Sequence, residues 1–146
     1  MKVKDILAVK GRQVVTIPKD TGVIEAMSIF SANRVGSLVI VDQEKNVLGI
    51  IGGRDVLMAV VNHPDSIKDL KVESIMTTNL IIGTEEDDID YIQAIMTENR
   101  IRHVPIMDGR ELRGMVSIGD VVKALLKAKD VENRYLQDYI ADKYPG

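Results

Sequence analysis

Two aspartates, Asp55 and Asp120, close a short pattern that the chain carries twice. The first copy reads GIIGGRDVL over residues 49–57, and the second reads GMVSIGDVV over residues 114–122. A carboxylate at a helix start can accept two hydroxyl hydrogens, such as those of a ribose. The unpaired N–H groups of a helix start and a nearby serine hydroxyl suit a phosphate. The pattern therefore favours a nucleotide, although such an aspartate can also act only as a helix cap worth about 1 kcal/mol.

The elements that must position these aspartates also occur twice. MSIFSANRV at 27–35 aligns with QAIMTENRI at 93–101, and LVIVD at 38–42 aligns with VPIMD at 104–108. Each copy predicts a β-α-β-β-α unit, with its last helix beginning near the aspartate. The predicted strands cover residues 14–17, 38–41 and 47–51 in the first copy and 80–82, 104–107 and 112–117 in the second.

The repeat divides the chain into four parts. The first unit covers residues 1–62, a linker with Pro64 and Asp65 covers 63–71, and the second unit covers 72–129. Neither unit is large enough to bury a comfortable core alone. We therefore expect an α/β fold in which two pseudo-symmetric units pack through their sheets. The tail, residues 130–146, carries Val131, Tyr135 and Tyr139 at a spacing of four, which predicts an amphipathic helix against the module, a dimer mate or another protein.

Composition excludes several classes of function. The net charge of −3 argues against a nucleic-acid partner, and the absence of Cys excludes disulfides and cysteine-based zinc sites. No apolar run approaches the ~18 residues of a membrane span. We expect a cytoplasmic protein without a membrane partner. No Ser/His/Asp arrangement, paired catalytic carboxylates or metal-ligand spacing is found, so we do not expect an enzyme.

Together these segments resemble a tandem pair of CBS domains (named after cystathionine β-synthase), often called a Bateman module. The resemblance covers residues 1 to about 129 and is carried by the repeat, the strand segments after Asn33 and Asn99, and the doubled glycine-to-aspartate pattern. It implies a regulatory module that binds an adenosine ligand between its two units. AMP, ADP, ATP, NAD and S-adenosylmethionine all share that adenosine. It also implies a disc-like homodimer, parallel or antiparallel.

The resemblance implies two ligand sites, each built from both units. Site A takes its pattern from the second unit and strand or turn residues from the first: Val15, Val35, Gly36, Ser37, Met115, Ser117 and Asp120. Site B does the reverse: Ile50, Gly52, Arg54, Asp55, Leu80, Ile101, Arg102 and His103. In site A, Asp120 is expected to hold the ribose and Ser117 to lie near phosphate.

The two sites are predicted to differ in charge. Gly52 lacks the hydroxyl expected in site B, but Arg54, Arg102 and His103 could substitute as phosphate donors. Site A, with hydroxyls and few cations, would suit a lightly charged ligand such as AMP, and site B would suit ADP or ATP. The alternative is that site B is empty and Arg54 is simply solvated or paired.

Two functions remain open on these grounds. One is an adenine-nucleotide sensor that signals to an unidentified effector protein by a conformational change. The other is a dimerising adaptor that recruits a partner without a ligand.

Overall fold

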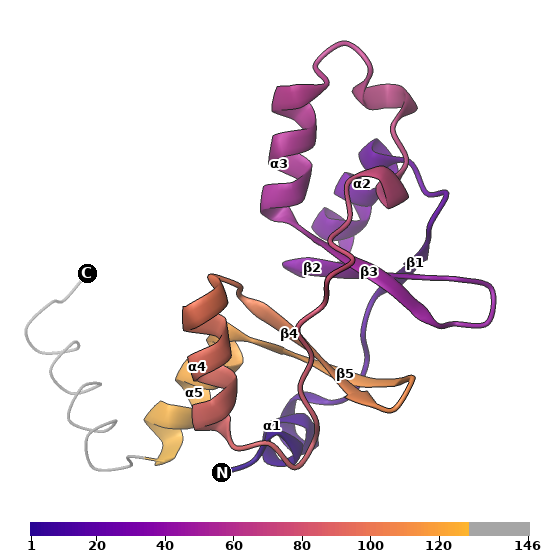
Figure 1. Cartoon of the computed structure of the whole chain (residues 1–146). Coiled ribbons are helices and arrows are strands. Elements are labelled where there is room, and N and C mark those ends of the chain that lie inside the picture. Colours follow the sequence, from indigo (N-terminus) through magenta and orange to yellow (C-terminus); the bar gives the residue numbers. More distant parts are fainter. Residues whose placement is uncertain (129–146) are drawn as a thin grey trace, which may run out of the picture.

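The structure, a computed structural model, describes residues 1–128 and confirms the α/β fold with two halves stacked on each other (Figure 1). The predicted tail helix lies outside the described residues. The upper half in Figure 1 contains β1 (Thr16–Pro18), α2 (Val23–Asn33), β2 (Ser37–Val41), β3 (Val47–Gly52) and α3 (Gly53–Asn62). The lower half contains α4 (Ile89–Asn99), β4 (His103–Asp108), β5 (Glu111–Ser117) and α5 (Ile118–Ala128). The remaining elements are α1 (Val3–Lys10) and two 3-10 turns, η1 (Ile67–Asp69) and η2 (Val72–Ser74).

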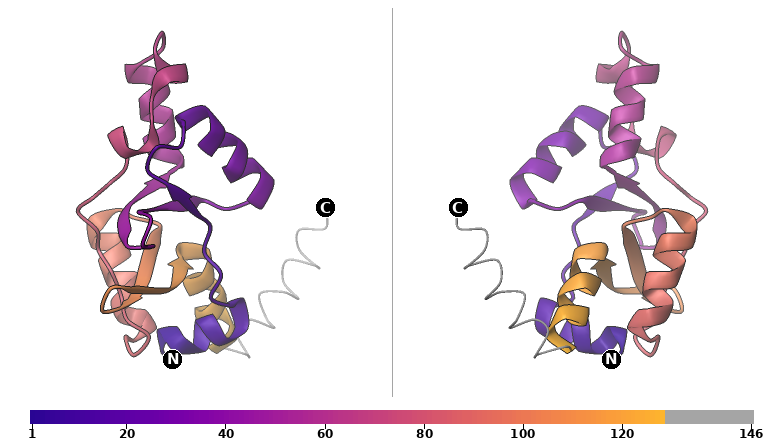
Figure 2. Two further views of the ribbon diagram at one scale, coloured as in Figure 1. Left: turned by 90° about the vertical axis from the view of Figure 1, so that its right-hand side faces the viewer. Right: turned by 90° about the vertical axis from the view of Figure 1, so that its left-hand side faces the viewer.

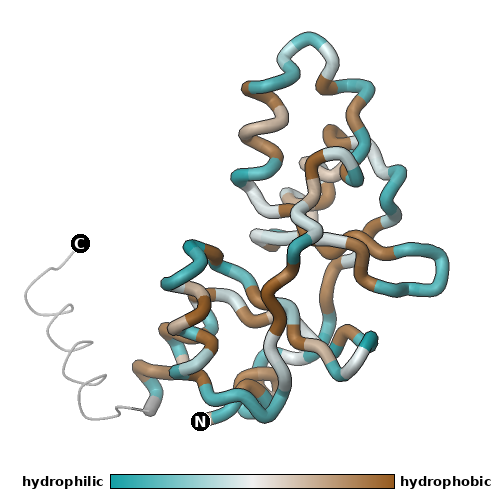
Figure 3. Tube along the Cα trace, in the orientation of Figure 1, coloured by the Kyte–Doolittle hydropathy of each residue, from teal (hydrophilic) through white to brown (hydrophobic). Residues whose placement is uncertain are grey.

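Each half is built around a small sheet. In the first half β1 pairs parallel with β2, and β2 pairs antiparallel with β3; in the second half β4 pairs antiparallel with β5. The strands are rich in apolar residues, whereas the turn between β2 and β3 is hydrophilic (Figure 3). Among residues 1–128, no helix combines the length and the apolar character needed to cross a bilayer.

The strand predicted over residues 80–82 is not formed. Only the following residue, Gly83, pairs with β4, by donating its N–H to Pro105 O (3.0 Å) and accepting a bond from Met107 N–H (2.9 Å). The N–H of Leu80 instead bonds Thr78 O at 3.0 Å, which turns the chain away from the sheet. The three apolar residues were therefore not sufficient to make a strand.

The helix α1 packs on the second half, although it begins the first repeat. Val3, Ile6 and Leu7 are buried in one cluster with residues of α4, β4, β5 and α5. A side chain at Gly114 would place its Cβ 2.8 Å from Leu7 Cδ2, so the bare glycine lets α1 approach β5 closely. Backbone bonds from Val3 N–H to Asp87 O (2.9 Å) and from Ile89 N–H to Met1 O (3.1 Å) fix its start.

The segment that begins the second repeat packs in turn on the first half. Val72 is fully buried in the core of the first half, with Ile67, Leu70, Ile75 and Met76 packed around that core. The N–H of Val72 bonds Thr21 O at 2.8 Å, and the N–H of Val23 bonds Leu70 O at 3.0 Å. Each repeat therefore supplies the leading segment that completes the core of the other. Figure 2 shows α1 lying among the elements of the second half in both side views.

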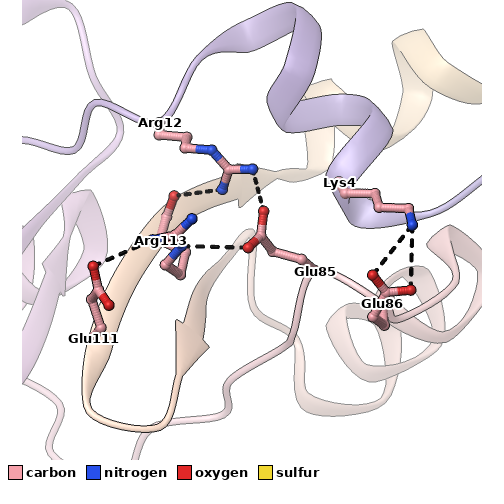
Figure 4. Close-up of polar contacts among 6 residues, drawn as sticks. All are labelled: Lys4, Arg12, Glu85, Glu86, Glu111 and Arg113. Atoms are coloured by element: carbon pink, nitrogen blue, oxygen red, sulfur yellow. Dashed lines mark hydrogen bonds and ion pairs between the residues drawn. The ribbon is translucent and has the colours of Figure 1, made fainter.

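Ion pairs at the surface follow the same exchange. Lys2 pairs with Glu86. Figure 4 shows the pair of Lys4 with Glu86 and the pair of Arg12 with Glu85, which also faces Arg113 at 3.4 Å. Lys2, Lys4 and Glu86 are exposed, so their pairs contribute little to stability, whereas Glu85 is only 22% exposed. These pairs link the N-terminal segment to the loop before α4.

Two left-handed residues shape the approach to the sites. Arg34 (φ 53°) ends α2 and Arg100 (φ 54°) ends α4, at equivalent positions of the two repeats. Each reverses the chain so that the next two residues lead into β2 or β4. Gly36, just before β2, and His103, at the start of β4, thereby lie close together between the halves.

The exchange predicts that α1 is needed for the stability of the second half. Leu7→Ala should lower the free energy of unfolding by about 3 kcal/mol, because Leu7 is buried and its removal leaves a cavity over Gly114. Urea denaturation followed by circular dichroism measures this. Val9→Ala is the matched control on the same helix, since Val9 is 81% exposed. Equal losses for both variants would contradict the packing described.

Candidate ligand-binding sites

The start of α5 is organised by Ser117 and Asp120. The N–H of Ser117 donates to Asp120 Oδ2 at 2.8 Å, and the N–H of Asp120 donates to Ser117 Oγ at 3.1 Å. This reciprocal pair is a capping box. The carboxylate therefore has a structural role, but that role engages Oδ2. Within the described part of the chain, no hydrogen bond reaches Oδ1, so this oxygen remains able to accept hydroxyl groups.

Lys10, the last residue of α1, reaches this carboxylate from outside the repeat. Its Nζ lies 2.7 Å from Asp120 Oδ2 and 2.8 Å from the backbone carbonyl oxygen of Met115. The side chains are 35% exposed for Lys10 and 18% exposed for Asp120. Site A, for which the sequence predicted few cations, therefore includes one cation that the prediction did not name.

The pKa of Asp120 reflects these contacts. Burial raises the pKa, but the hydrogen bonds from Lys10 and from the Ser117 backbone outweigh it and leave the pKa below its usual value. The carboxylate is consequently ionised at neutral pH. An ionised carboxylate is an acceptor only, which is the form that ribose hydroxyls require.

His103, which the sequence predicted for site B, lies beside Ser117 and Asp120 in the structure. It faces Ser117 in the β4–β5 register, and a Cβ on Gly36 would lie 2.8 Å from its Cε1 and Nε2 atoms. Burial and the nearby positive charge of Lys10 lower the pKa of the His103 imidazole, although Asp120 opposes the shift. The ring is therefore neutral at pH 7 and offers one N–H donor.

Site B has a similar arrangement at the start of α3, with fewer polar side chains. The N–H of Gly52 donates to Asp55 Oδ2 at 2.8 Å, as Ser117 does to Asp120. The backbone does not require glycine at position 52, because φ is −118° and a Cβ there would lie 3.7 Å from its nearest neighbour. Gly52 therefore removes a hydroxyl without any conformational need. Within residues 1–128, Asp55 has no cation within 4.0 Å.

The other predicted site residues differ in burial. Val15, Val35, Ile101 and Leu80 are partly buried, and Ser37 and Met115 are buried. The backbone of Ile50 is engaged by Thr77 through bonds of 3.0 and 2.9 Å. Arg54 and Arg102 are exposed. Gly36 lies between the sites. A Cβ added to Gly36 would meet the His103 ring, and a Cβ added to Gly52 would have the Gly36 carbonyl oxygen as its nearest neighbour.

The surface has two hollows, one beside Asp55 and one far from both aspartates. One of about 220 Å³ runs from Asp55 along α3 to Ser74 and Ile75, and Asp55 is the one predicted site B residue among those that line it. A larger one of about 370 Å³ lies between the two hairpin turns, where Val47 and Arg110 are among its lining residues. The larger hollow is at the opposite end of the strands from both aspartates, and no carboxylate lines it.

Lys10 was not among the residues predicted from the sequence. A signal was present, because Val3, Ile6 and Leu7 recur at helical spacing before Lys10 and Gly11, a typical helix end. That signal predicts the helix but not its partner. The contact with Asp120 depends on the exchange between the halves.

The chain belongs to the CBS domain family, which matches residues 3–62 and again residues 72–127. The doubled unit agrees with this family. Among known proteins, the chain is similar to the mitochondrial CBS domain-containing protein CBSX3 of Arabidopsis thaliana, with 34% identity over 97% of this chain and 73% of that protein.

Solved structures show the same fold. The CBS-domain containing protein ATU1752 of Agrobacterium tumefaciens has 39% identity and a TM-score of 0.82, covering 84% of this chain and 92% of that chain. The CBS domain pair of protein MJ0100, solved with 5′-methylthioadenosine and S-adenosyl-L-methionine, has 28% identity and a TM-score of 0.75, covering 86% of this chain and 99% of that chain.

The position of His103 can be tested by titration. Lys10→Met should raise the pKa of the His103 imidazole, because it removes a positive charge that disfavours the imidazolium. The ring carbon shifts in NMR spectra between pH 4 and 9 report this pKa. Lys4→Met, which removes the same charge at the Glu86 pair, should leave it unchanged. An unchanged pKa in Lys10→Met would place His103 elsewhere.

Proposed function

We propose that this chain is a regulatory module that binds an adenosine-containing ligand between its two repeats and passes the event to a partner protein. AMP, ADP and ATP are the leading candidates, and NAD and S-adenosylmethionine are the alternatives. The observation that carries the proposal is the start of α5. There an ionised Asp120 keeps one oxygen available beside the Ser117 hydroxyl.

The family supports the adenosine part of the proposal. The MJ0100 domain pair was solved with two ligands that both contain adenosine. Ribose hydroxyls are good donors to a carboxylate, and the apolar strand residues around the sites can cover a base. The doubled frame provides two such positions, of which site A has more polar groups.

A signal would arise from the way the halves are joined. Site A combines the second repeat with Lys10 of α1 and with His103, which touches Gly36 of the first repeat. A ligand that reaches from these groups to the Gly36 turn of the first half can shift the arrangement of the halves only by its difference in affinity for the two states. No step of chemistry is required, and we propose a binding module rather than an enzyme.

Binding of adenosine ligands tests the proposal directly. Calorimetric titration of AMP, ADP, ATP, NADH and S-adenosylmethionine should show at least one ligand that binds. Asp120→Asn should weaken that ligand by about tenfold or more if site A holds it, because a charged acceptor is lost. Asp55→Asn is the matched variant for site B. If all five ligands fail to bind, or if neither variant changes affinity, the proposal is wrong.

The exposed apolar faces of α3 and α5 favour association with a second copy. On α3, Leu57 is 61% exposed and Val61 is 62% exposed, and on α5 Val122 is 48% exposed. Both helices lie on the same side of the molecule in Figure 1. We propose a homodimer through this surface. The same surface would also serve a dimerising adaptor, which is the second candidate function.

The dimer makes a prediction about oligomeric state. Leu57→Glu combined with Val122→Glu should convert a dimer to a monomer, because two charges would be buried at the interface. Analytical ultracentrifugation measures the change. Val9→Glu, at an apolar residue on α1 that is even more exposed, should leave the dimer intact. A wild-type protein that sediments as a monomer would contradict the proposal.

A further inference from the structure

Lys10 is held at site A by two acceptors from the second repeat. Its ammonium group contacts Asp120 Oδ2 at 2.7 Å and the Met115 carbonyl oxygen at 2.8 Å. An ammonium group has three donors, so one N–H remains for a further acceptor. Both contacts fix the charge of Lys10 beside the carboxylate that would hold a ribose.

The contacts of Lys10 leave the ribose acceptor available. Lys10 and the Ser117 backbone both use Oδ2 of Asp120, whereas Oδ1 receives no hydrogen bond from residues 1–128. A ribose can therefore bind without displacing Lys10. The Lys10 ammonium group, the Ser117 hydroxyl and the His103 imidazole lie around this carboxylate, and they are the groups that would donate to a 5′-phosphate on the same ribose.

The second repeat has no equivalent of Lys10. Alignment of Val3–Leu7 with Val72–Met76 places Asn79 at the position of Lys10. In the described residues no cation lies within 4.0 Å of Asp55, and Gly52 replaces Ser117. The two frames thus share an aspartate but differ in the groups that surround its ligand.

We propose that Lys10 makes site A selective for adenosine ligands that carry a 5′-phosphate. This inference rests on the proposed function and specifies the ligand class of one site. A phosphate gains a charge-assisted hydrogen bond and Coulomb attraction from the ammonium group. An uncharged 5′-substituent gains neither, and the positive sulfonium of S-adenosylmethionine is repelled.

The test compares AMP with adenosine, which has the same base and ribose without the phosphate. Both are titrated into the full chain as wild type, Lys10→Met and Lys10→Arg. We expect Lys10→Met to weaken AMP about tenfold or more and to leave adenosine within about threefold of wild type. Lys10→Arg, which keeps the charge, should retain most of the AMP affinity.

Lys4→Met is the matched control, since it removes a charge from the same helix at a pair with Glu86. Equal weakening of AMP and adenosine by Lys10→Met would show that Lys10 only supports the structure, and would overturn the proposal. Unchanged AMP affinity would also overturn it.

A measurement on the wild type alone gives a second test. AMP should bind more tightly than adenosine, and the difference should shrink as salt rises from 0.05 to about 0.5 M, because salt screens a partly exposed charge. Adenosine that binds as tightly as AMP would contradict selection by Lys10. A protein that binds neither would instead overturn the proposed function itself.

Discussion

The burial of α1 against the second half is the interaction on which the rest of the structure depends. Val3, Ile6 and Leu7 have no apolar surface to cover within their own repeat, and the second half's core is incomplete without them. Residues 67–76 make the reciprocal contribution to the first half. A repeat of this size cannot bury a sufficient core alone, and exchanging the leading segments solves that problem for both repeats at once.

The same exchange determines the chemistry of the candidate sites. Because α1 ends over β5, its last residue reaches the aspartate of the second repeat. The equivalent segment, residues 67–77, ends over β3, where Thr77 pairs with Ile50. This segment places no cation at Asp55. Two frames that follow the same glycine-to-aspartate pattern therefore acquire different surroundings from the chain that leads into each repeat. We conclude that the asymmetry between the sites comes from packing between the halves as well as from Gly52.

Sequence periodicity predicted the local structure well and the contacts between repeats poorly. The doubled unit, five of the six strands and the helix starts near Asp55 and Asp120 followed from spacing within a repeat. The strand at residues 80–82 failed because pairing with β4 was limited to Gly83. Lys10 and the position of His103 could not be predicted, because both depend on residues far along the chain. Apolar spacing shows that a helix face is covered, but it does not identify which element covers it.

The most direct test of the account is a crystal structure of the protein grown with AMP. The account predicts AMP at the start of α5, with its ribose hydroxyls on Asp120 Oδ1 and its phosphate within hydrogen-bond distance of Lys10 Nζ. AMP bound with its phosphate away from Lys10 would contradict the assigned selectivity. AMP bound only in the hollow between the hairpins, or an empty site A under saturating AMP, would contradict the central claim that this frame is a nucleotide site.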